Sequence, residues 1–390
     1  MKIKKLFAKT INDTRREKTI EVSLETDFGK FVSSSPNGKS KGEFERPIWK
    51  KSINNDILTV NKYFIEDINF KDFNDLHLIE EAFSEIVGGN TIIALEYCFL
   101  KALAFKENKE VWEVVSDSIK IKPKKMPYLI GNIIGGGAHS NWKGPTFQEF
   151  HIIPVSGIKR SIEILKRAHE NSGEILKNID KNFKGSLNDE NAWQTNLGNE
   201  KVIEIIWDVK ENILDEFGGT IHLGIDVAAS EFFKDNNYIY QKEKRSESKN
   251  GQIKYMERLS KRFFYIEDPL EQNDFTGFSK ILSISKGLIV GDDLIATSPD
   301  RLLEAIKKKS VNAIIIKPNQ IGSLLEVKKI VEICRKNNIK MIFSHRSGET
   351  SEDIISDIAF GFGADFVKFG ALGPGREEKL KRLRKIEEYM

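Results

Sequence analysis

The chain has few cysteines, no long hydrophobic run and no excess of one charge, and each shortage excludes a class of protein. Its 390 residues include only Cys98 and Cys334, so neither a disulfide scaffold nor a cysteine-ligated zinc site is expected. Lys and Arg number 61 and Asp and Glu number 58, which gives a formal net charge of +3. A nucleic-acid-binding protein would show a clustered basic excess, so we expect no nucleic-acid partner.

Membrane insertion is not expected either. No stretch approaches the ~18 apolar residues of a transmembrane helix. The basic residues 1–7 are not followed by an apolar stretch of signal-sequence length. Hydrophobic residues make up 39% of the chain and aromatic residues 10%, which is enough for a large core and excludes wholesale disorder. These features predict a cytoplasmic protein. The length predicts about two or three domains, or one large barrel with an addition.

The first part of the chain has the pattern of strands followed by helices. Residues 3–10 and 19–26 are rich in β-branched and apolar residues with period-2 stretches, and residues 27–30 form a turn signal before Phe31 and Val32. Helical periodicity runs from about residue 61 to 117 and is clearest in the apolar-rich residues 91–105. We therefore predict an α+β cap domain at residues 1–118, built from a three-stranded meander and helices.

Beyond a linker at residues 122–127, short apolar runs alternate with helical stretches of about 12 to 20 residues, a pattern typical of βα units and a parallel sheet. Six of the runs end in a charged or reactive residue, and these ends are 23 to 41 residues apart, close to the ~30 residues of one unit in a (β/α)₈ barrel. The fold class predicted is α/β, with a TIM-like barrel at residues 119–390. The six residues are Asp226, Glu267, Asp292, Lys317, His345 and Lys368.

In such a barrel the carboxyl ends of the strands surround one face, where the active site lies. Each reactive residue taken alone could simply begin a loop, but six in order favour one shared pocket. Asp226, Glu267 and Asp292 would then bring three negative charges together, which requires a cation. Oxygen ligands suit Mg²⁺. The alternative is three separate salt bridges to Lys or Arg.

Two lysines at neighbouring strand ends suggest the reaction. A lysine beside a metal site and partly removed from water can have a lowered pKa and act as a general base. A single lysine is usually a surface charge, but Lys317 ends the apolar run 313–316, which makes a surface role less favoured. A metal that binds a carboxylate, together with a neutral lysine, suits removal of a proton from the adjacent carbon.

Several segments in order resemble the enolase family. The strongest is residues 344–350, Ser-His-Arg-Ser-Gly-Glu-Thr, and the others are residues 148–150, 226–232, 266–269, 291–294 and 317–322. The resemblance spans nearly the whole chain. It implies a barrel with an N-terminal cap, a lysine base with Mg²⁺ as known for that superfamily, and a homodimer or larger homo-oligomer. The implied reaction is the dehydration of 2-phospho-D-glycerate, a phosphorylated carboxylate, to phosphoenolpyruvate.

The resemblance also implies a role for each matching residue. Lys317 would take the C2 proton, and Glu190, with Glu149 near it, would act as general acid for loss of the C3 hydroxyl. Residues expected to bind or line the substrate are His139, Gln148, His345, Arg346, Ser347 and Lys368. The expected metal ligands are Asp226, Glu267 and Asp292 for the first Mg²⁺, and Ser40 for a second Mg²⁺ that arrives with the substrate.

Three segments depart from the usual family pattern. Residues 38–42 read Gly-Lys-Ser-Lys-Gly instead of Gly-Ala-Ser-Thr-Gly, and residues 188–192 read Asn-Asp-Glu-Asn-Ala instead of Gly-Asp-Glu-Gly-Gly. Arg15 is followed by Arg-Glu-Lys instead of Gly-Asn-Pro. Two alternatives therefore stay open, an enolase-like paralogue acting on another carboxylate and a homologue without catalysis. The remaining histidines show no metal spacing and are expected to have core or surface roles: His77, His151, His169 and His222.

Overall fold

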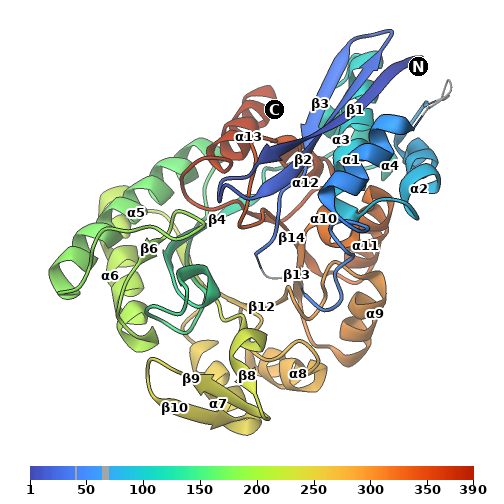
Figure 1. The fold of residues 1–390 in the computed structure, drawn as a ribbon. Coiled ribbons are helices and arrows are strands. Elements are labelled where there is room, and N and C mark those ends of the chain that lie inside the picture. The colour runs from blue at the N-terminus through green and yellow to red at the C-terminus, as the bar shows by residue number, and fades with distance from the viewer. Residues whose placement is uncertain (40–41, 64–69) are drawn as a thin grey trace.

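An eight-stranded barrel lies beside a three-stranded sheet with its own helices (Figure 1). The structure is a computed structural model that describes residues 1–39, 42–63 and 70–390. At the N-terminus, β1 (Ile3–Asn12), β2 (Lys18–Thr26) and β3 (Lys30–Ser34) form an antiparallel meander in chain order. The Thr26 amide donates to the Gly29 carbonyl at 2.8 Å and closes the turn before β3. The predicted three-stranded meander is therefore confirmed.

Helices follow this meander in the N-terminal part. They are α1 (Ile53–Lys62), the 3₁₀ turn η1 (Phe73–Leu76), α2 (His77–Phe83), α3 (Gly89–Lys106) and α4 (Val111–Ser118). The helical part begins earlier than residue 61 because the Ser52 hydroxyl accepts from the Asn55 amide and caps α1 at Ile53. Helix α3 is buried along most of its length, as its apolar sequence predicts. Residues 119–127 form no helix or strand, and the division at residues 118 and 119 stays a prediction.

Eight strands close the barrel. They are β4 (Tyr128–Gly135), β5 (Glu149–Pro154), β7 (Ile221–Asp226), β11 (Tyr265–Glu267), β12 (Leu288–Gly291), β13 (Ala313–Ile316), β14 (Lys340–Ser344) and β15 (Phe366–Lys368). Each strand pairs with the next in this order, and β15 pairs with β4 to close the ring. The predicted TIM-like barrel is therefore confirmed.

One strand departs from the predicted parallel arrangement. Strand β5 runs antiparallel to both β4 and β7, whereas β7, β11, β12, β13, β14, β15 and β4 are parallel along the remaining pairs. The connection from β4 to β5 carries only the 3₁₀ turn η2 (Ala138–Ser140), so no crossover helix returns the chain to the starting edge. Two helices, α5 (Ile158–Ile179) and α6 (Asn199–Phe217), then lie between β5 and β7 in the chain.

Helices surround the barrel (Figure 1). They are α5 (Ile158–Ile179), α6 (Asn199–Phe217), α7 (Lys249–Leu259), α8 (Phe275–Ile284), α9 (Pro299–Lys308), α10 (Pro318–Ile321), α11 (Leu324–Lys336), α12 (Ile354–Gly361) and α13 (Glu377–Tyr389). Short elements in the loops are β6 (Trp193–Gln194), η3 (Ala229–Phe232), β8 (Phe233–Lys234), β9 (Asn237–Tyr240) and β10 (Arg245–Ser248). In the part of the chain that the structure describes, no helix combines the length and apolar character needed to span a bilayer.

Apolar side chains fill the barrel interior and leave its carboxyl end for polar groups. The interior cluster includes Ile130, Ile153, Val290, Ile315 and Ile342, all fully buried. Because side chains alternate across a strand, residues two positions further along point into the same interior, one layer higher. The polar residues at the strand ends therefore lie directly above a layer of apolar side chains inside the barrel.

Candidate active site

The reactive side chains predicted at six strand ends surround the carboxyl end of the barrel. Asp226, Glu267 and Lys368 are the last residues of β7, β11 and β15. Five of the six line one pocket, and Glu267 lies beneath it, fully buried. The residues that directly follow β12, β13 and β14 are Asp292, Lys317 and His345.

The Lys368 ammonium lies among three carboxylates. Its Nζ is 3.0 Å from Asp226 Oδ2, 2.8 Å from Glu267 Oε2 and 3.3 Å from Glu149 Oε1. Burial alone would lower the pKa of Lys368, but the attraction of Asp226, Glu149 and Glu267 raises it well above its ordinary value. Lys368 therefore stays a cation that can hold an anionic group.

Lys317 forms a close ion pair with Asp292, with 2.5 Å between Nζ and Oδ2. Burial alone would lower the pKa of Lys317, but the Asp292 charge outweighs it and raises the pKa. The direction is opposite to the one expected for a lysine base from desolvation alone. The ion pair with Asp292 therefore favours the protonated form of Lys317.

The donor set at these strand ends fits a hard divalent cation. Two buried carboxylate oxygens, Glu267 Oε1 and Asp292 Oδ1, have no hydrogen-bond partner among the described residues. Burial, followed by the charge of the neighbouring Asp226, raises the pKa of Glu267 to about 8, so its ionised form would gain from a nearby cation. Unpartnered carboxylate oxygens on neighbouring strands are the ligands that Mg²⁺ takes.

A further acidic group lies next to these residues and was not predicted. Carboxylate oxygens of Asp268, Asp292 and Asp293 lie within 4.8 Å of one another. Asp268 accepts the backbone N–H of Asp292 at 3.1 Å and that of Asp293 at 2.6 Å. The Asp268 carboxylate therefore holds the turn after β12. The available signal in the sequence was that a second acidic residue directly follows each predicted ligand, Asp268 after Glu267 and Asp293 after Asp292.

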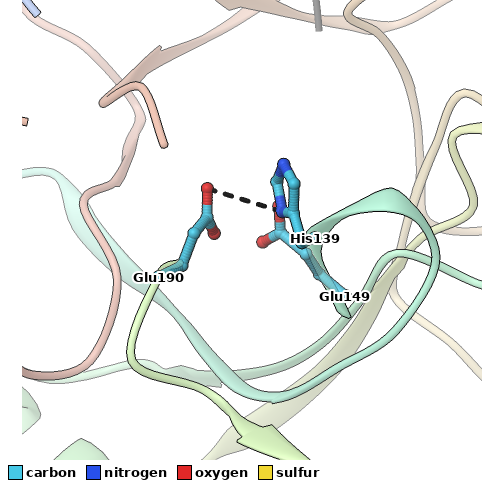
Figure 2. A group of neighbouring side chains, drawn as sticks. All are labelled: His139, Glu149 and Glu190. Carbon is cyan, nitrogen blue, oxygen red and sulfur yellow. Dashed lines mark ion pairs between the residues drawn. The ribbon is translucent and has the colours of Figure 1, made fainter. Parts of the chain in front are cut away.

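Glu149 and Glu190 face each other with His139 beside them (Figure 2). His139 Nδ1 is 3.7 Å from Glu190 Oε1 and 3.9 Å from Glu149 Oε1. Burial and the Glu190 charge raise the pKa of Glu149 well above its ordinary value. Burial would also raise the pKa of Glu190, but His139 and His345 outweigh it and lower that pKa. Glu149 is therefore the member of the pair that binds a proton more readily.

Other predicted pocket residues contact the same carboxylates. Gln148 Nε2 donates to Asp226 Oδ2 at 3.4 Å. His345 Nε2 lies 3.6 Å from Glu190 Oε1, and burial lowers the pKa of His345 to about 4. The His345 ring therefore lies close to Glu190 in a buried part of the pocket.

The residues expected to hold phosphate are in contact with the N-terminal part of the chain. Arg346 Nη2 is 3.0 Å from Glu45 Oε2. The Ser347 hydroxyl accepts from the Lys39 amide at 2.9 Å and from Arg15 Nη1 at 3.2 Å. Arg346 and Ser347 are each 5% exposed. The site is therefore completed by segments from both ends of the chain.

Gly38 and Lys39 also line the pocket, whereas the predicted metal ligand Ser40 lies outside the described residues. A Cβ atom on Gly38 would lie 1.9 Å from Arg346 Nη2, so a larger residue here would require the Arg346 guanidinium to shift. Lys39 Nζ is 2.7 Å from Asp189 Oδ2 and 3.4 Å from Asn141 Oδ1. Lys39 thus joins the Ser347 side of the pocket to the loop that carries Glu190.

Sequence reasoning missed three buried residues around the site. Arg376 is fully buried, and its Nη2 donates to the carbonyls of Ser347 at 3.2 Å and Asp189 at 3.1 Å. His151 and Tyr265 lie inside β5 and β11, two positions from Glu149 and Glu267 along their strands. The i, i+2 spacing in a strand was the available signal, because such residues share a face.

Comparison with known proteins identifies the family. Residues 123–390 match the enolase C-terminal TIM barrel domain. An enolase of Picrophilus torridus is 36% identical, with 100% of this chain and 99% of that protein covered. An enolase of Methanosphaera stadtmanae is 34% identical, with 97% of this chain and 95% of that protein covered. An enolase of Methanothermobacter thermautotrophicus is 32% identical over 99% of this chain and 96% of that protein.

The domain match covers more than half of the chain, and the relatives match it over nearly its full length. The matched residues contain all eight barrel strands, including the antiparallel β5, and the acidic residues at the strand ends. The chain is therefore an enzyme of the lyase class and belongs to the enolase family.

Proposed function

We propose that the chain catalyses the Mg²⁺-dependent, reversible dehydration of 2-phospho-D-glycerate to phosphoenolpyruvate. The family supports the reaction type. The observation that carries the proposal is the division of one pocket into two sides. Lys317 and Lys368 lie among carboxylates on one side, and the neighbouring Glu149 and Glu190 lie on the other.

Lys317 is the proposed base. It would take the proton from C2, beside the substrate carboxylate, and become an ammonium ion. Asp292 can hold either the Lys317 ammonium or a divalent cation, and Lys317 is available as a neutral base only in the second case. Lys368 keeps its proton and would hold the substrate carboxylate by charge-assisted hydrogen bonds.

The glutamate pair is the proposed acid. Loss of the C3 hydroxyl as water requires one proton. The sequence resemblance implies that Glu190 is the acid, and the raised pKa of Glu149 beside the lowered pKa of Glu190 supports Glu149 as the source of that proton. We therefore propose that Glu149 supplies the proton that Glu190 delivers to the leaving hydroxyl. Lys317 thus gains the C2 proton, the glutamate pair loses one proton, and the C3 hydroxyl leaves as water.

The remaining pocket residues would bind and surround the substrate. The Arg346 guanidinium and Ser347 hydroxyl would hold the phosphate, because a guanidinium offers paired donors to phosphate oxygens. His139, Gln148 and His345 would line the pocket. Asp226, Glu267 and Asp292 would hold the first Mg²⁺, which when bound supplies positive charge next to the substrate carboxylate. A second Mg²⁺ at Ser40, a homodimer and a cytoplasmic location remain part of the proposal, based on the resemblance.

An assay with 2-phosphoglycerate and Mg²⁺ tests the proposal. Purified protein should produce the ultraviolet absorbance of phosphoenolpyruvate, and Lys317→Met should lower kcat by about 10²-fold to 10⁴-fold. Lys340→Met is the matched control, because Lys340 pairs with Asp365 at 2.8 Å at the opposite end of the barrel. This control should keep the wild-type rate.

Isotope exchange separates the two proposed steps. In deuterated water, exchange of the C2 proton should be lost in Lys317→Met and retained in Glu190→Gln, whereas both variants should fail to form phosphoenolpyruvate. A folded wild-type protein that binds Mg²⁺ but forms no phosphoenolpyruvate would reject the proposed substrate. That result would favour the paralogue, whose altered segment carries the Lys39 to Asp189 ion pair.

A further inference from the structure

Two fully buried residues, His151 on β5 and Tyr265 on β11, lie behind the pocket and do not line it. Side chains two positions apart on a strand share a face. His151 therefore lies one layer below Glu149, and Tyr265 lies one layer below Glu267. Both rings are inside the barrel, where the surrounding layer is apolar.

Each ring contacts the carboxylate above it. His151 Nε2 is 2.9 Å from Glu149 Oε2, and the Tyr265 hydroxyl donates to Glu267 Oε2. Lys368 Nζ joins the two carboxylates from the other side, through Glu149 Oε1 and Glu267 Oε2. The two rings meet edge to face, with centroids 5.5 Å apart and planes at 81°. The five side chains thus form a closed ring of contacts.

Strand register and a glycine place the two rings side by side. His151 pairs with Gly224 of β7, and Gly224 pairs with Tyr265 of β11. A Cβ atom on Gly224 would lie 3.1 Å from His151 Nδ1 and 3.1 Å from Tyr265 Cβ, which is tighter than ordinary packing. Glycine at this position therefore leaves the space in which the two rings touch.

The chemistry of the rings matches what the carboxylates lack. Lys368 Nζ contacts the carboxyl groups of Asp226, Glu267 and Glu149, so one ammonium group serves three acidic side chains. The Tyr265 hydroxyl donates a further hydrogen bond, and the His151 ring offers one at Nε2, without a further charged side chain. A carboxylate with one oxygen held by a fixed donor loses rotational freedom, and so does the ammonium bound to it.

We propose that His151 and Tyr265 are positioning residues that fix Glu149 and Glu267, and through them Lys368, in the orientation that catalysis requires. This inference rests on the proposed function for the roles of Glu149 and Lys368. A purely structural role for the two rings would require only their volume. A positioning role requires the donor atoms as well, and that difference can be measured.

Isosteric variants test the proposal in the full-length protein. Tyr265→Phe removes only the hydroxyl and should lower kcat/KM by about 10-fold to 100-fold. His151→Leu should lower kcat for phosphoenolpyruvate formation by a similar factor of about 10-fold to 100-fold, while C2 proton exchange continues. His151→Gln keeps a donor at a similar reach and should restore most of the rate.

Tyr255→Phe is the matched control, because the Tyr255 hydroxyl donates to Glu200 Oε1 at 2.8 Å away from the pocket. It should keep the wild-type kcat and KM, and its shift in Tm should equal that of Tyr265→Phe. If Tyr265→Phe and His151→Leu keep the wild-type kcat and KM, the proposal is wrong. Equal losses in His151→Gln and His151→Leu would also overturn it.

Mg²⁺ titration calorimetry without substrate separates this inference from the proposed function. Because Tyr265 holds a proposed ligand, Tyr265→Phe should weaken Mg²⁺ binding by about 10-fold, and Tyr255→Phe should not. A wild-type protein that forms no phosphoenolpyruvate but shows this difference would reject the proposed function and keep the inference. Equal Mg²⁺ affinities for wild type, Tyr265→Phe and Tyr255→Phe would reject the inference.

Discussion

At the scale of single residues, Glu96 on α3 is a buried acid with an unfilled hydrogen-bonding site. Its Oε2 accepts the Leu324 amide at 2.8 Å, and its Oε1 has no partner in the described part of the chain. Burial, followed by the charge of Glu80, raises the pKa of Glu96 well above 4.5, and Arg46 opposes the shift only in part. Folding therefore favours the protonated form of this side chain.

The stability of the protein should consequently depend on Glu96 and pH. The folded state keeps a proton that the unfolded chain loses near pH 4.5, so the free energy of unfolding falls as pH rises from 4.5 toward the folded pKa. Glu96→Gln imitates the protonated form and should be more stable than wild type by about 1 to 3 kcal/mol at pH 7.5. Urea unfolding at pH 4 should show almost no difference, and an equal gain at both pH values would contradict the pKa direction.

Residues at strand ends were predictable, whereas residues inside strands were not. Asp226, Lys317 and Lys368 each follow an apolar run, so their sequence position alone places them at the carboxyl end of the barrel. His151 and Tyr265 lie inside runs, where a ring is typical of a core position. The i, i+2 spacing places each ring below its carboxylate, but only the pairing of β5, β7 and β11 brings the two rings together, and no pattern in the sequence encodes that register.

At the scale of elements, two loops meet across the mouth of the pocket through Lys39 and Asp189. Each of the two side chains is 30% exposed. Arg376 also holds the Asp189 loop, because its Nη2 donates to the carbonyls of Asp189 and Ser347. The Asp189 loop therefore has a second contact, and loss of the ion pair alone should have a moderate effect.

A double-mutant cycle on kcat/KM measures the contribution of this ion pair. Lys39→Met and Asp189→Asn should each lower kcat/KM, and the cycle should give a coupling of about 0.2 to 1 kcal/mol that decreases in high salt. Lys308→Met, which removes an exposed pair with Glu304 on α9, is the control and should change nothing. Strictly additive losses would show that Lys39 and Asp189 act independently.

The elements also show where sequence patterns are informative. The period-2 stretches and the turn signal predicted β1, β2 and β3, and the apolar run predicted α3. The reversed direction of β5 was not predicted, because its apolar residues are equally suited to a parallel or an antiparallel neighbour. Strand direction depends on the connection from β4, a loop whose path local periodicity does not determine.

At the scale of the whole molecule, Mg²⁺ should stabilise the fold, because the proposed ligands come from three different strands. A ligand that binds only the folded state adds about 2.7 kcal/mol at 100 times its Kd. Calorimetry should therefore show a higher Tm with excess Mg²⁺ than with EDTA. Asp292→Asn should remove most of this difference. The same Tm for wild type in Mg²⁺ and in EDTA would contradict the proposed metal site.

The pairing of β15 with β4 has a consequence for synthesis of the protein. Phe366 pairs with Tyr128, so the ring of strands stays open until the ribosome has produced almost all of the 390 residues. Until then a nascent chain presents unpaired backbone at β4 and β14, which favours aggregation. An arrest of translation before residue 366 would also omit Lys368, so the same late event would leave the product both open and inactive.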